Sequence, residues 1–374
     1  MQTIIIGASA AGLAAAKCLS DQGIKADLLE ASNTIGLRWQ NHYRRLHLHT
    51  PKSRSALPGL AFPRSAPRYP SRQDVVDYIQ EYARHFNLRP TFNTPVNRVA
   101  PTMDGWQLDT PEGARHARHV ILATGYNNLP HLPDKPGLSS FPGRVLHAAD
   151  YRSGAAFSGQ KVLVVGFGNS GCEIAIDLHE QGARPSISVR GPVNVVPRDL
   201  FGIPILALGE VLRHVPRLAD RLNAPLMRLI LGDIRSLGLQ PLAYGPMQQI
   251  ARGQIPLLDI GTLRLMREGA ITRQAGIARI EGPRVIFDDG RSDDFDAIVF
   301  ATGYRHGLEQ LLALPDDEKE RRINELRMPI GQRQIDGTAG LHIIGGYLSP
   351  RGMLYEIGHE ARHIARRIAD SMKT

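Results

Sequence analysis

The chain has 374 residues, enough for two domains, and its 42% hydrophobic and 22% charged content excludes disordered, collagen-like and coiled-coil proteins. The formal net charge of +9 fits either a solvated, arginine-rich surface or attraction of an anionic ligand; without a basic tail, we expect no nucleic-acid partner. Two cysteines, Cys18 and Cys172, cannot build a disulfide framework, and we expect a cytoplasmic chain without a signal peptide or membrane span.

The N-terminal residues predict a strand, a glycine turn, a helix and a second strand. The strand Ile4–Ile6 runs into the turn Gly7–Gly12, the helix covers Leu13–Leu19, and the second strand is Ala26–Glu30. Such a turn directs backbone N–H groups toward a pyrophosphate at the positive end of the helix. Glu30 follows the turn at about the 20-residue distance expected of an acid that accepts hydrogen bonds from ribose hydroxyls.

The middle of the first half contains irregular and extended segments. Residues 31–72 are dense in Pro, Arg and His and predict a long functional loop, and Asp74–Phe86 predicts an amphipathic helix. Phe92–Ala117 predicts short hairpin strands, and Val120–Tyr126 predicts a buried strand that ends at Gly125.

The same order of elements then repeats. The matching elements are the strand Lys161–Val165, the turn Gly166–Gly171, the helix Cys172–Gln181, the strand Ser186–Arg190 and the buried run Ala297–Tyr304. This duplication predicts an α/β fold of two Rossmann-like, dinucleotide-binding domains, each built on a doubly wound parallel sheet.

The two turns differ at the residues that select a nucleotide. The first turn has Ser9 where a glycine is expected; its side chain restricts the approach of the backbone, although its hydroxyl can donate to a phosphate. Its second strand ends in Glu30, which suits FAD. The second turn keeps Gly168, and its strand ends in Arg190, which is either a surface arginine or a partner for the 2′-phosphate of NADPH. We therefore predict FAD in the first cradle and NADPH in the second.

Residues 200–240 account for the extra length of the second copy, and leucines such as Leu218 and Leu222 recur there at helical spacing. We predict a helical insert in the NADPH domain. We expect its leucines to be core positions in a roof over the substrate channel. The alternative, which we do not expect, is contact with a membrane surface beside Arg217 and Arg221.

The segment Phe141–Tyr151 links the two copies and reads F-x-G-x-x-x-H-x-x-x-Y. This pattern, just before Gly166–Gly171, resembles the signature of the class B flavin-containing monooxygenases. Further stretches resemble the YUCCA-type branch, the plant auxin-forming monooxygenases and their bacterial relatives, so that the likeness covers nearly the whole chain. These stretches are Leu46–Lys52, Gly166–Leu178, Val193–Arg198, Ile230–Asp233, Pro256–Leu263 and Phe295–Tyr304.

Two positions separate the branches of this family. A Baeyer–Villiger monooxygenase would carry Trp at the position of Tyr151, and animal-type amine and sulfide oxygenases carry Asn where His49 stands. The YUCCA-type branch also has His there, which favours that branch. The signature also implies that His147 holds the linker rather than acting as a general base.

The resemblance implies an NADPH- and O₂-dependent, single-component flavin monooxygenase (EC 1.14.13-type) that acts through a C4a-(hydro)peroxyflavin. Its small-molecule substrate is either an aryl 2-oxo acid such as indole-3-pyruvate, which undergoes oxidative decarboxylation, or an amine or sulfide that is oxygenated at N or S. A second alternative is an NADPH–flavin reductase or oxidase that releases peroxide. No metal is expected, and the oligomeric state stays open, with a dimer as one option.

The resemblance also implies an FAD-binding domain in two parts, residues 1–155 and 286–374, around an NADPH-binding domain of residues 156–285. Asn169 and His49 are the candidate catalytic residues. The candidate FAD-binding residues are Gly7, Ser9, Ala10, Ala11, Gly12, Glu30, Ala31, Arg38, Trp39, His49, Thr50, Val96, Ala123, Thr124, Gly125, Gly345 and Gly346. The candidate NADPH-binding residues are Gly166, Gly168, Asn169, Ser170, Gly171, Arg190, Ala301, Thr302 and Gly303.

Overall fold

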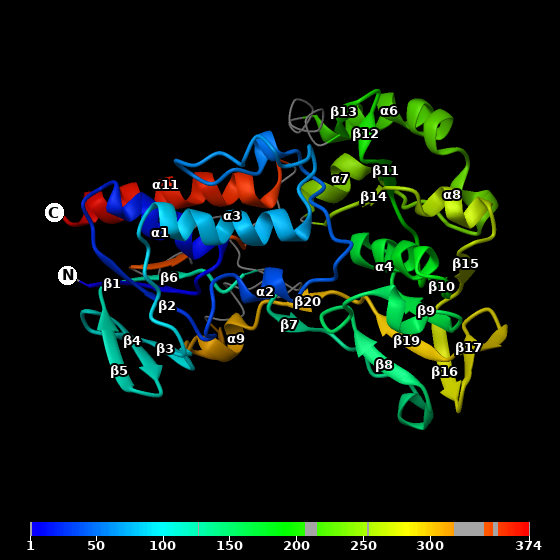
Figure 1. The fold of residues 1–374 in the computed structure, drawn as a ribbon, viewed down its shortest axis with the longest axis horizontal. Coiled ribbons are helices and arrows are strands. Elements are labelled where there is room, and N and C mark those ends of the chain that lie inside the picture. The colour runs from blue at the N-terminus through cyan, green and yellow to red at the C-terminus, as the bar shows by residue number, and fades with distance from the viewer. Residues whose placement is uncertain are drawn as a thin grey trace. The chain divides into compact units, whose positions relative to one another are not determined.

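The computed structural model describes residues 2–125, 127–205, 215–252, 254–317, 340–346 and 351–373. The chain divides into two compact units, which Figure 1 shows as a ribbon. Unit 1 comprises Met1–Gln40, Thr50–Leu129 and Tyr304–Thr374, and unit 2 comprises Asn41–His49 and Pro130–Gly303. The short strands β7 (Leu129–Pro130) and β20 (Tyr304–Arg305) lie where the chain passes from one unit to the other. The domain limits predicted from the sequence stay a prediction.

Unit 1 is built on a parallel sheet in the order β2-β1-β6-β21. Its strands are β1 (Thr3–Ile6), β2 (Ala26–Leu29), β6 (His119–Leu122) and β21 (Leu341–Ile343). The helices described in this unit are α1 (Ala10–Ser20), α2 (Leu37–Gln40), α3 (Arg72–His85), α9 (Leu308–Leu311) and α11 (Met353–Ser371), with the 3-10 turn η1 (Lys52–Arg54). Helix α1 packs against α11 and α3, as Figure 1 shows.

The other face of this sheet packs on an antiparallel meander. The meander consists of β3 (Arg98–Thr102), β4 (Gly105–Thr110) and β5 (Gly113–Ala117). Alternate sheet residues, among them Ile4, Val120 and Leu341, form one buried core with Trp106 and Leu108 of the meander. Burial on both faces explains why the sheet strands are runs of apolar residues instead of an alternating pattern.

Unit 2 repeats this arrangement on a parallel sheet in the order β15-β10-β9-β19-β8. Its strands are β8 (Arg144–His147), β9 (Lys161–Val165), β10 (Arg184–Ser188), β15 (Thr272–Gln274) and β19 (Ala297–Phe300). One face packs on α4 (Asn169–Glu180) and α8 (Thr262–Arg267). The other packs on the meander of β16 (Ile277–Glu281), β17 (Arg284–Phe287) and β18 (Ser292–Asp294). The predicted α/β fold with two parallel-sheet halves is confirmed.

The remaining elements of unit 2 lie mostly between β10 and β15. They are β11 (Val195–Pro197), β12 (Asp199–Leu200), β13 (Ile203–Pro204), α6 (Pro216–Leu231), η4 (Ile234–Leu237), α7 (Pro246–Ala251) and β14 (Leu257–Asp259), with η2 (Leu138–Ser140) and η3 (Gly154–Phe157) before β9. Part of the predicted insert lies here, while its residues 206–214 fall outside the described residues.

Two details of the predicted elements were wrong. Helices α1 and α4 begin at Ala10 and Asn169, not after the third glycine, because the last residues of each glycine motif form the first helical turn. Strand β10 ends at Ser188, so Arg190 lies just beyond the strand.

The prediction that the insert leucines are core positions was also wrong for the described part of α6. Leu218 and Leu222 are 54% and 68% exposed. Helical spacing reports which residues share a face, but it does not report which face turns toward the core.

A buried histidine holds the turn that follows the central strand in each unit. The ring of His306 hydrogen bonds to the backbone carbonyl of Gly125, and Nε2 of His147 lies 3.1 Å from the carbonyl oxygen of Gly303. Nδ1 of His147 accepts from the N–H of Ala149 at 3.1 Å, so both of its ring nitrogens are used and its neutral tautomer is set. Burial lowers the pKa of both rings, and it lowers the pKa of His306 to about 4.

Acidification should therefore destabilise the protein. The folded state disfavours protonation of His306, so its stabilising contribution is complete above the ordinary pKa of 6.5 and is lost as the pH falls from 6.5 toward about 4. A shift of this size corresponds to about 3 kcal/mol of unfolding free energy. We expect His306→Gln, which can donate the same bond without titrating, to lose less thermal stability than wild type between about pH 7 and pH 5.

The measurement is the melting temperature of both proteins across that pH range. His342, whose pKa burial lowers to about 3, contributes in the same direction but is present in both proteins. An equal loss of melting temperature in the two proteins would contradict the assignment to His306.

Candidate functional site

The first glycine turn closes on the neighbouring strand because two of its residues lack a side chain. Gly7 has φ +105°, and a Cβ there would lie 2.6 Å from the carbonyl oxygen of Ala123. A Cβ on Gly12 would lie 1.8 Å from the carbonyl oxygen of Gly7. Any side chain at either position would push α1 away from β1 and β6. The predicted cradle therefore exists as a tight strand–turn–helix corner.

The N-terminus of α1 presents backbone donors at this corner. Ser9 is the N-cap residue with extended backbone, and its side chain does not cap the helix. The first intrahelical bond closes from Leu13 N to Ser9 O, which leaves the first-turn N–H groups of Ala10, Ala11 and Gly12 for a ligand. A helix of this length carries a partial positive charge at that end, which favours an anion.

Glu30 lies directly beside the turn. Its carboxylate accepts from the N–H of Ala8 at 2.7 Å, and from the N–H and hydroxyl of Ser32 at 2.9 and 2.7 Å. The acid predicted from spacing alone is therefore within reach of a nucleotide that the turn would bind. Ala31, the next residue, is exposed.

The C-terminal glycines close the same corner from the other side. Gly345 has φ +73°, and a Cβ there would lie 3.4 Å from Cβ of Ala11. The N–H of Gly345 donates to Oε2 of Glu360 at 2.7 Å, and Glu360 is 1% exposed. A buried carboxylate on α11 thus holds this loop next to the first turn of α1, and Gly346 is buried as well.

The segment around α2 is tied to the residues after β6. The guanidinium of Arg38 donates to the carbonyl of Asn128 at 2.9 Å, and the Asn128 amide donates to the carbonyl of His306 at 3.0 Å. Because His306 binds Gly125, these contacts link Arg38 to the Ala123–Gly125 turn. Trp39 is half-buried on the same short helix.

Thr50 and Val96 lie at other positions of unit 1. The Thr50 hydroxyl lies 2.7 Å from the Ser55 hydroxyl, and a Cβ on Gly352 would lie 2.5 Å from the Thr50 methyl. Val96 packs against the core of the β3-β4-β5 meander. No direct contact between these two residues and the first turn is recorded in the described residues.

The second cradle has the same sterics as the first. Gly166 has φ +118°, and a Cβ there would lie 2.5 Å from the carbonyl oxygen of Ala301. A Cβ on Gly171 would lie 2.1 Å from the carbonyl oxygen of Gly166. Gly168, the N-cap of α4, faces open space, with nothing within 4 Å of a built Cβ. This open space lies where a phosphate would approach the backbone.

Asn169 and Ser170 open helix α4 at this cradle. Oδ1 of Asn169 accepts from the N–H of Leu258 at 2.8 Å, so its side chain holds β14. Within the part of the chain that the structure describes, no hydrogen bond of its Nδ2 group is found, so this group can donate to a ligand. Ser170 is partly exposed at the same helix end.

Arg190 is exposed just beyond β10. Among the described residues, its guanidinium makes no recorded hydrogen bond or ion pair. A Cβ on Gly276 would lie 3.5 Å from Cγ of Arg190, which shows that the Arg190 stem lies along the backbone beside β15. The charge is therefore available to an anion.

Hydrogen bonds hold the turn Ala301–Gly303 in unit 2, as they hold the turn Ala123–Gly125 in unit 1. The Thr302 hydroxyl donates to the carbonyl of His131, and the N–H of His131 donates to the carbonyl of Gly303 at 3.0 Å. The ring of His147 binds the same Gly303 carbonyl, so the turn is held from two sides. It faces the cradle through Ala301, whose Cβ would lie 3.3 Å from a Cβ on Gly171.

Helix α4 carries an acidic stripe, defined here as Glu173, Asp177 and Glu180. Nε2 of His49 lies 2.8 Å from Oε1 of Glu173, and the hydroxyl of Tyr151 donates to Asp177 at 2.6 Å. Arg45 binds Glu180 through two nitrogens, at 2.8 and 2.9 Å. Nδ1 of His49 and Oε2 of Glu173 are buried and have no hydrogen-bond partner in the described structure.

Sequence reasoning missed several residues that hold these sites. They are His306, Asp177, Glu173 and Glu360, each buried and each bound to a residue distant in sequence. The sequence does contain one signal for these acids. Glu173, Asp177 and Glu180 are spaced so that they lie on one face of the predicted helix.

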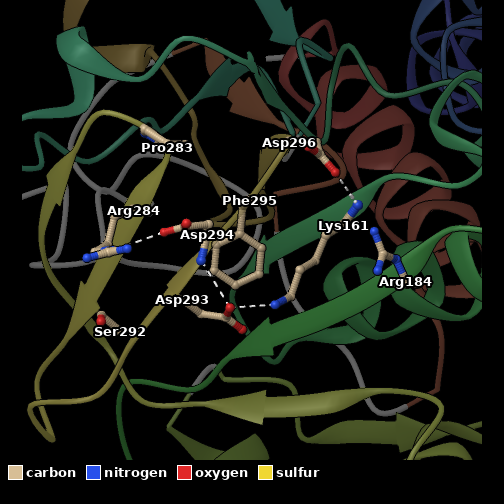
Figure 2. A pocket seen from close by; sticks show the side chains of 9 residues that line it. All are labelled: Lys161, Arg184, Pro283, Arg284, Ser292, Asp293, Asp294, Phe295 and Asp296. Atoms are coloured by element: carbon tan, nitrogen blue, oxygen red, sulfur yellow. Dashed lines mark hydrogen bonds and ion pairs between the residues drawn. The ribbon is translucent and has the colours of Figure 1, made fainter.

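A separate hollow of about 640 Å³ lies at the start of β9, the strand end opposite the cradle. Figure 2 shows its lining side chains, in which Lys161 pairs with Asp293 and Arg284 pairs with Asp294. These charges compensate one another, and none of the predicted site residues lines the hollow.

Neither cysteine is arranged for disulfide exchange. Cys18 and Cys172 are both buried and unpaired, and they lie in different units. Burial raises the pKa of the Cys18 thiol to about 11 and raises that of Cys172 further. A raised pKa disfavours the thiolate that such chemistry needs.

Comparison with known proteins agrees with this geometry. Residues 4–198 match the pyridine nucleotide-disulphide oxidoreductase family. Indole-3-pyruvate monooxygenase YUCCA6 of Arabidopsis thaliana is 40% identical over 361 residues, which cover 91% of this chain and 84% of that protein. Indole-3-pyruvate monooxygenase YUCCA1 of Oryza sativa subsp. japonica is 37% identical over 359 residues, covering 94% and 87%.

Solved structures share the fold along the whole chain. A flavin-containing monooxygenase from Stenotrophomonas maltophilia has a TM-score of 0.74 at 23% identity, covering 99% of this chain and 98% of that one. Cyclohexanone monooxygenase from Rhodococcus sp. Phi1 bound to NADP⁺ has a TM-score of 0.73 at 18% identity, covering 100% and 84%. The chain therefore belongs to the class B flavin-containing monooxygenases, within the pyridine nucleotide-disulphide oxidoreductase family, and among them to the YUCCA-type branch.

Proposed function

We propose that this oxidoreductase is an NADPH- and O₂-dependent flavin monooxygenase that oxidatively decarboxylates an aryl 2-oxo acid, with indole-3-pyruvate as the first substrate to test. The observation that carries the proposal is the pair of sterically equivalent cradles with opposite charges, Glu30 beside one and Arg190 beside the other. When bound, FAD accepts a hydride from NADPH and, once reduced, activates O₂ for transfer to the substrate.

Unit 1 would hold FAD. The first-turn amides of α1 would bind the pyrophosphate, with Ser9 as an additional hydroxyl donor. Glu30 would bind the ribose hydroxyls while keeping the turn in place through Ala8. The remaining contacts that we propose from the family resemblance are Gly7, Ala10, Ala11, Gly12, Ala31, Arg38, Trp39, His49, Thr50, Val96, Ala123, Thr124, Gly125, Gly345 and Gly346.

Substitution at the third glycine should remove the flavin. In Gly12→Ala, the new Cβ would lie 1.8 Å from the Gly7 carbonyl oxygen, so the corner must open. We expect at least about a tenfold lower FAD affinity, the equivalent of 1.4 kcal/mol. The measurement is the flavin-to-protein ratio after titration with FAD.

Gly23→Ala is the matched control at the other end of α1. A Cβ at Gly23 meets nothing within 4 Å, so the cost is confined to its left-handed φ of +71°, about 1 kcal/mol. Equal flavin content in the two folded variants, with folding checked by circular dichroism, would contradict the proposed FAD cradle.

Unit 2 would hold NADPH. The amides at the start of α4 would bind its pyrophosphate over Gly168, and the exposed guanidinium of Arg190 would bind the 2′-phosphate. Gly166, Ser170, Gly171, Ala301, Thr302 and Gly303 form the proposed floor of this site.

Arg190→Gln should change the preference between the two nicotinamide cofactors. A lost charge-assisted bond of about 1.5–3 kcal/mol corresponds to a KM for NADPH that rises roughly 10- to 100-fold, with little change for NADH. Arg184→Gln is the control, because Arg184 is the first residue of β10, at the other end of the same strand. Equal effects on both cofactors would overturn the role of Arg190.

Asn169 and His49 are the proposed catalytic residues. Asn169 would orient the nicotinamide through Nδ2 while Oδ1 stays bound to Leu258. Glu173 holds Nε2 of His49, and we propose from the family resemblance that this imidazole acts in catalysis. The names of the YUCCA relatives, which are indole-3-pyruvate monooxygenases, support the choice of substrate.

The test is conversion of indole-3-pyruvate to indole-3-acetate by the FAD-loaded protein with NADPH. Catalase must be present, because free peroxide decarboxylates 2-oxo acids without an enzyme. We expect one product for each NADPH consumed. NADPH oxidation without product would remove this substrate and favour N- or S-oxygenation, and stoichiometric release of peroxide would favour an oxidase. His49→Asn, which introduces the residue of amine and sulfide oxygenases, should lower the product formed per NADPH.

A further inference from the structure

Helix α6 presents three of its leucines to solvent. Leu218, Leu222 and Leu229 are 54%, 68% and 82% exposed. They are spaced i, i+4 and i+11, which places them on one face of the helix, and we call this face the leucine stripe. Within the described residues no other helix exposes large apolar side chains in such a row.

The opposite face of α6 attaches the helix to unit 2. Ala219 is 1% exposed and Leu231 is 9% exposed. The Asp220 carboxylate accepts from the N–H groups of Met247 and Gln248 at 2.8 and 3.0 Å, and so caps α7. The orientation is therefore fixed by buried contacts, and the leucine stripe faces outward.

Arginines run parallel to the leucine stripe. Arg217, Arg221 and Arg228 each precede one of its leucines by one position, share the same spacing and are exposed. The acid of this helix, Asp220, is engaged by α7. The exposed surface of α6 is therefore apolar along its centre and positive along one flank, without a compensating negative charge on the helix.

An apolar row beside a row of cations fits the boundary of an anionic bilayer. Leucines enter the acyl region to a shallow depth while arginines remain at the phosphates. The sequence adds a net charge of +9, which favours the same surface. No helix among the described residues is long and apolar enough to cross a membrane, so the contact would be along the surface.

We propose that α6 is a docking surface for an anionic lipid bilayer, on which it lies with the leucine stripe toward the acyl chains. The bilayer would cover the leucine stripe, which the described residues leave exposed, and phosphate headgroups would pair with the arginine row. The proposal does not depend on the proposed reaction.

The experiment is co-sedimentation of the full-length, FAD-loaded protein with vesicles. Vesicles of phosphatidylcholine with one quarter phosphatidylglycerol are compared with vesicles of phosphatidylcholine alone, at low and high salt. We expect binding to the anionic vesicles, and a weakening with salt because the surface potential is screened. Replacing Arg217, Arg221 and Arg228 with Gln should weaken it about 100-fold at low salt, since each cation contributes about tenfold or less.

A second variant combines Leu218→Gln, Leu222→Gln and Leu229→Gln. It should bind the anionic vesicles with an affinity at least about tenfold lower, while its net charge is unchanged. The matched apolar control is Met103→Gln with Leu132→Gln, two residues that are 101% and 48% exposed elsewhere. The matched charge control replaces Arg64, Arg89 and Arg279, which are exposed at other positions. Flavin content and melting temperature show that each variant is folded.

Three results would overturn the proposal. They are no binding of wild type to the anionic vesicles, equal binding by wild type and the leucine variant, or equal effects of the α6 arginines and the control arginines. A concentration-dependent dimer that the leucine variant abolishes, in the absence of vesicle binding, would assign the stripe to a second copy of the chain instead.

Discussion

The structure depends on a single steric constraint that is applied twice. In each half, the first glycine of the turn lies at positive φ under a carbonyl oxygen of the neighbouring central strand, Gly7 beneath Ala123 and Gly166 beneath Ala301. In each half, the third glycine then meets the carbonyl of the first, as Gly12 and Gly171 do. A Cβ at any of the four would overlap backbone atoms, which cannot move aside as a side chain can. The helix N-terminus, the adjacent acid or cation and the following turn take their positions from this corner.

Once the corner is set, the two copies diverge where a ligand would touch them. The first has a serine at the helix N-cap and a carboxylate held against the turn, whereas the second has open space at Gly168 and an exposed guanidinium. The two supporting histidines come from different places in the chain, but they have the same effect. His306 and His147 each hold the glycine carbonyl of an Ala-Thr-Gly turn. A duplicated scaffold thus offers opposite charges while its backbone stays the same.

The parts that could be predicted from sequence are those that local chemistry determines. The apolar strands, the glycine turns and the residues Glu30 and Arg190 follow from short-range pattern and spacing, and the comparisons confirm the family and the fold class. The contacts of His306 with Gly125 and of Glu360 with Gly345 join residues brought together only by the tertiary fold, so no local pattern contains them. The outward orientation of α6 was missed for a related reason, because Asp220 and Ala219 select the packed face through α7 and β11. The roles of the individual site residues stay predictions.

The acidic stripe of α4 has a consequence for how this protein can be divided. Residues 41–49 interrupt unit 1 in the chain but belong to unit 2, where His49 and Arg45 bind Glu173 and Glu180. A fragment that began at residue 130 would keep the helix and lose these two partners, and the nearly buried Glu173 would face an empty space in place of an imidazole. Without residues 41–49, unit 2 is therefore not a self-sufficient module. Transplanting it into another protein would require the nine-residue strap to be supplied with it, by fusion or as a separate peptide.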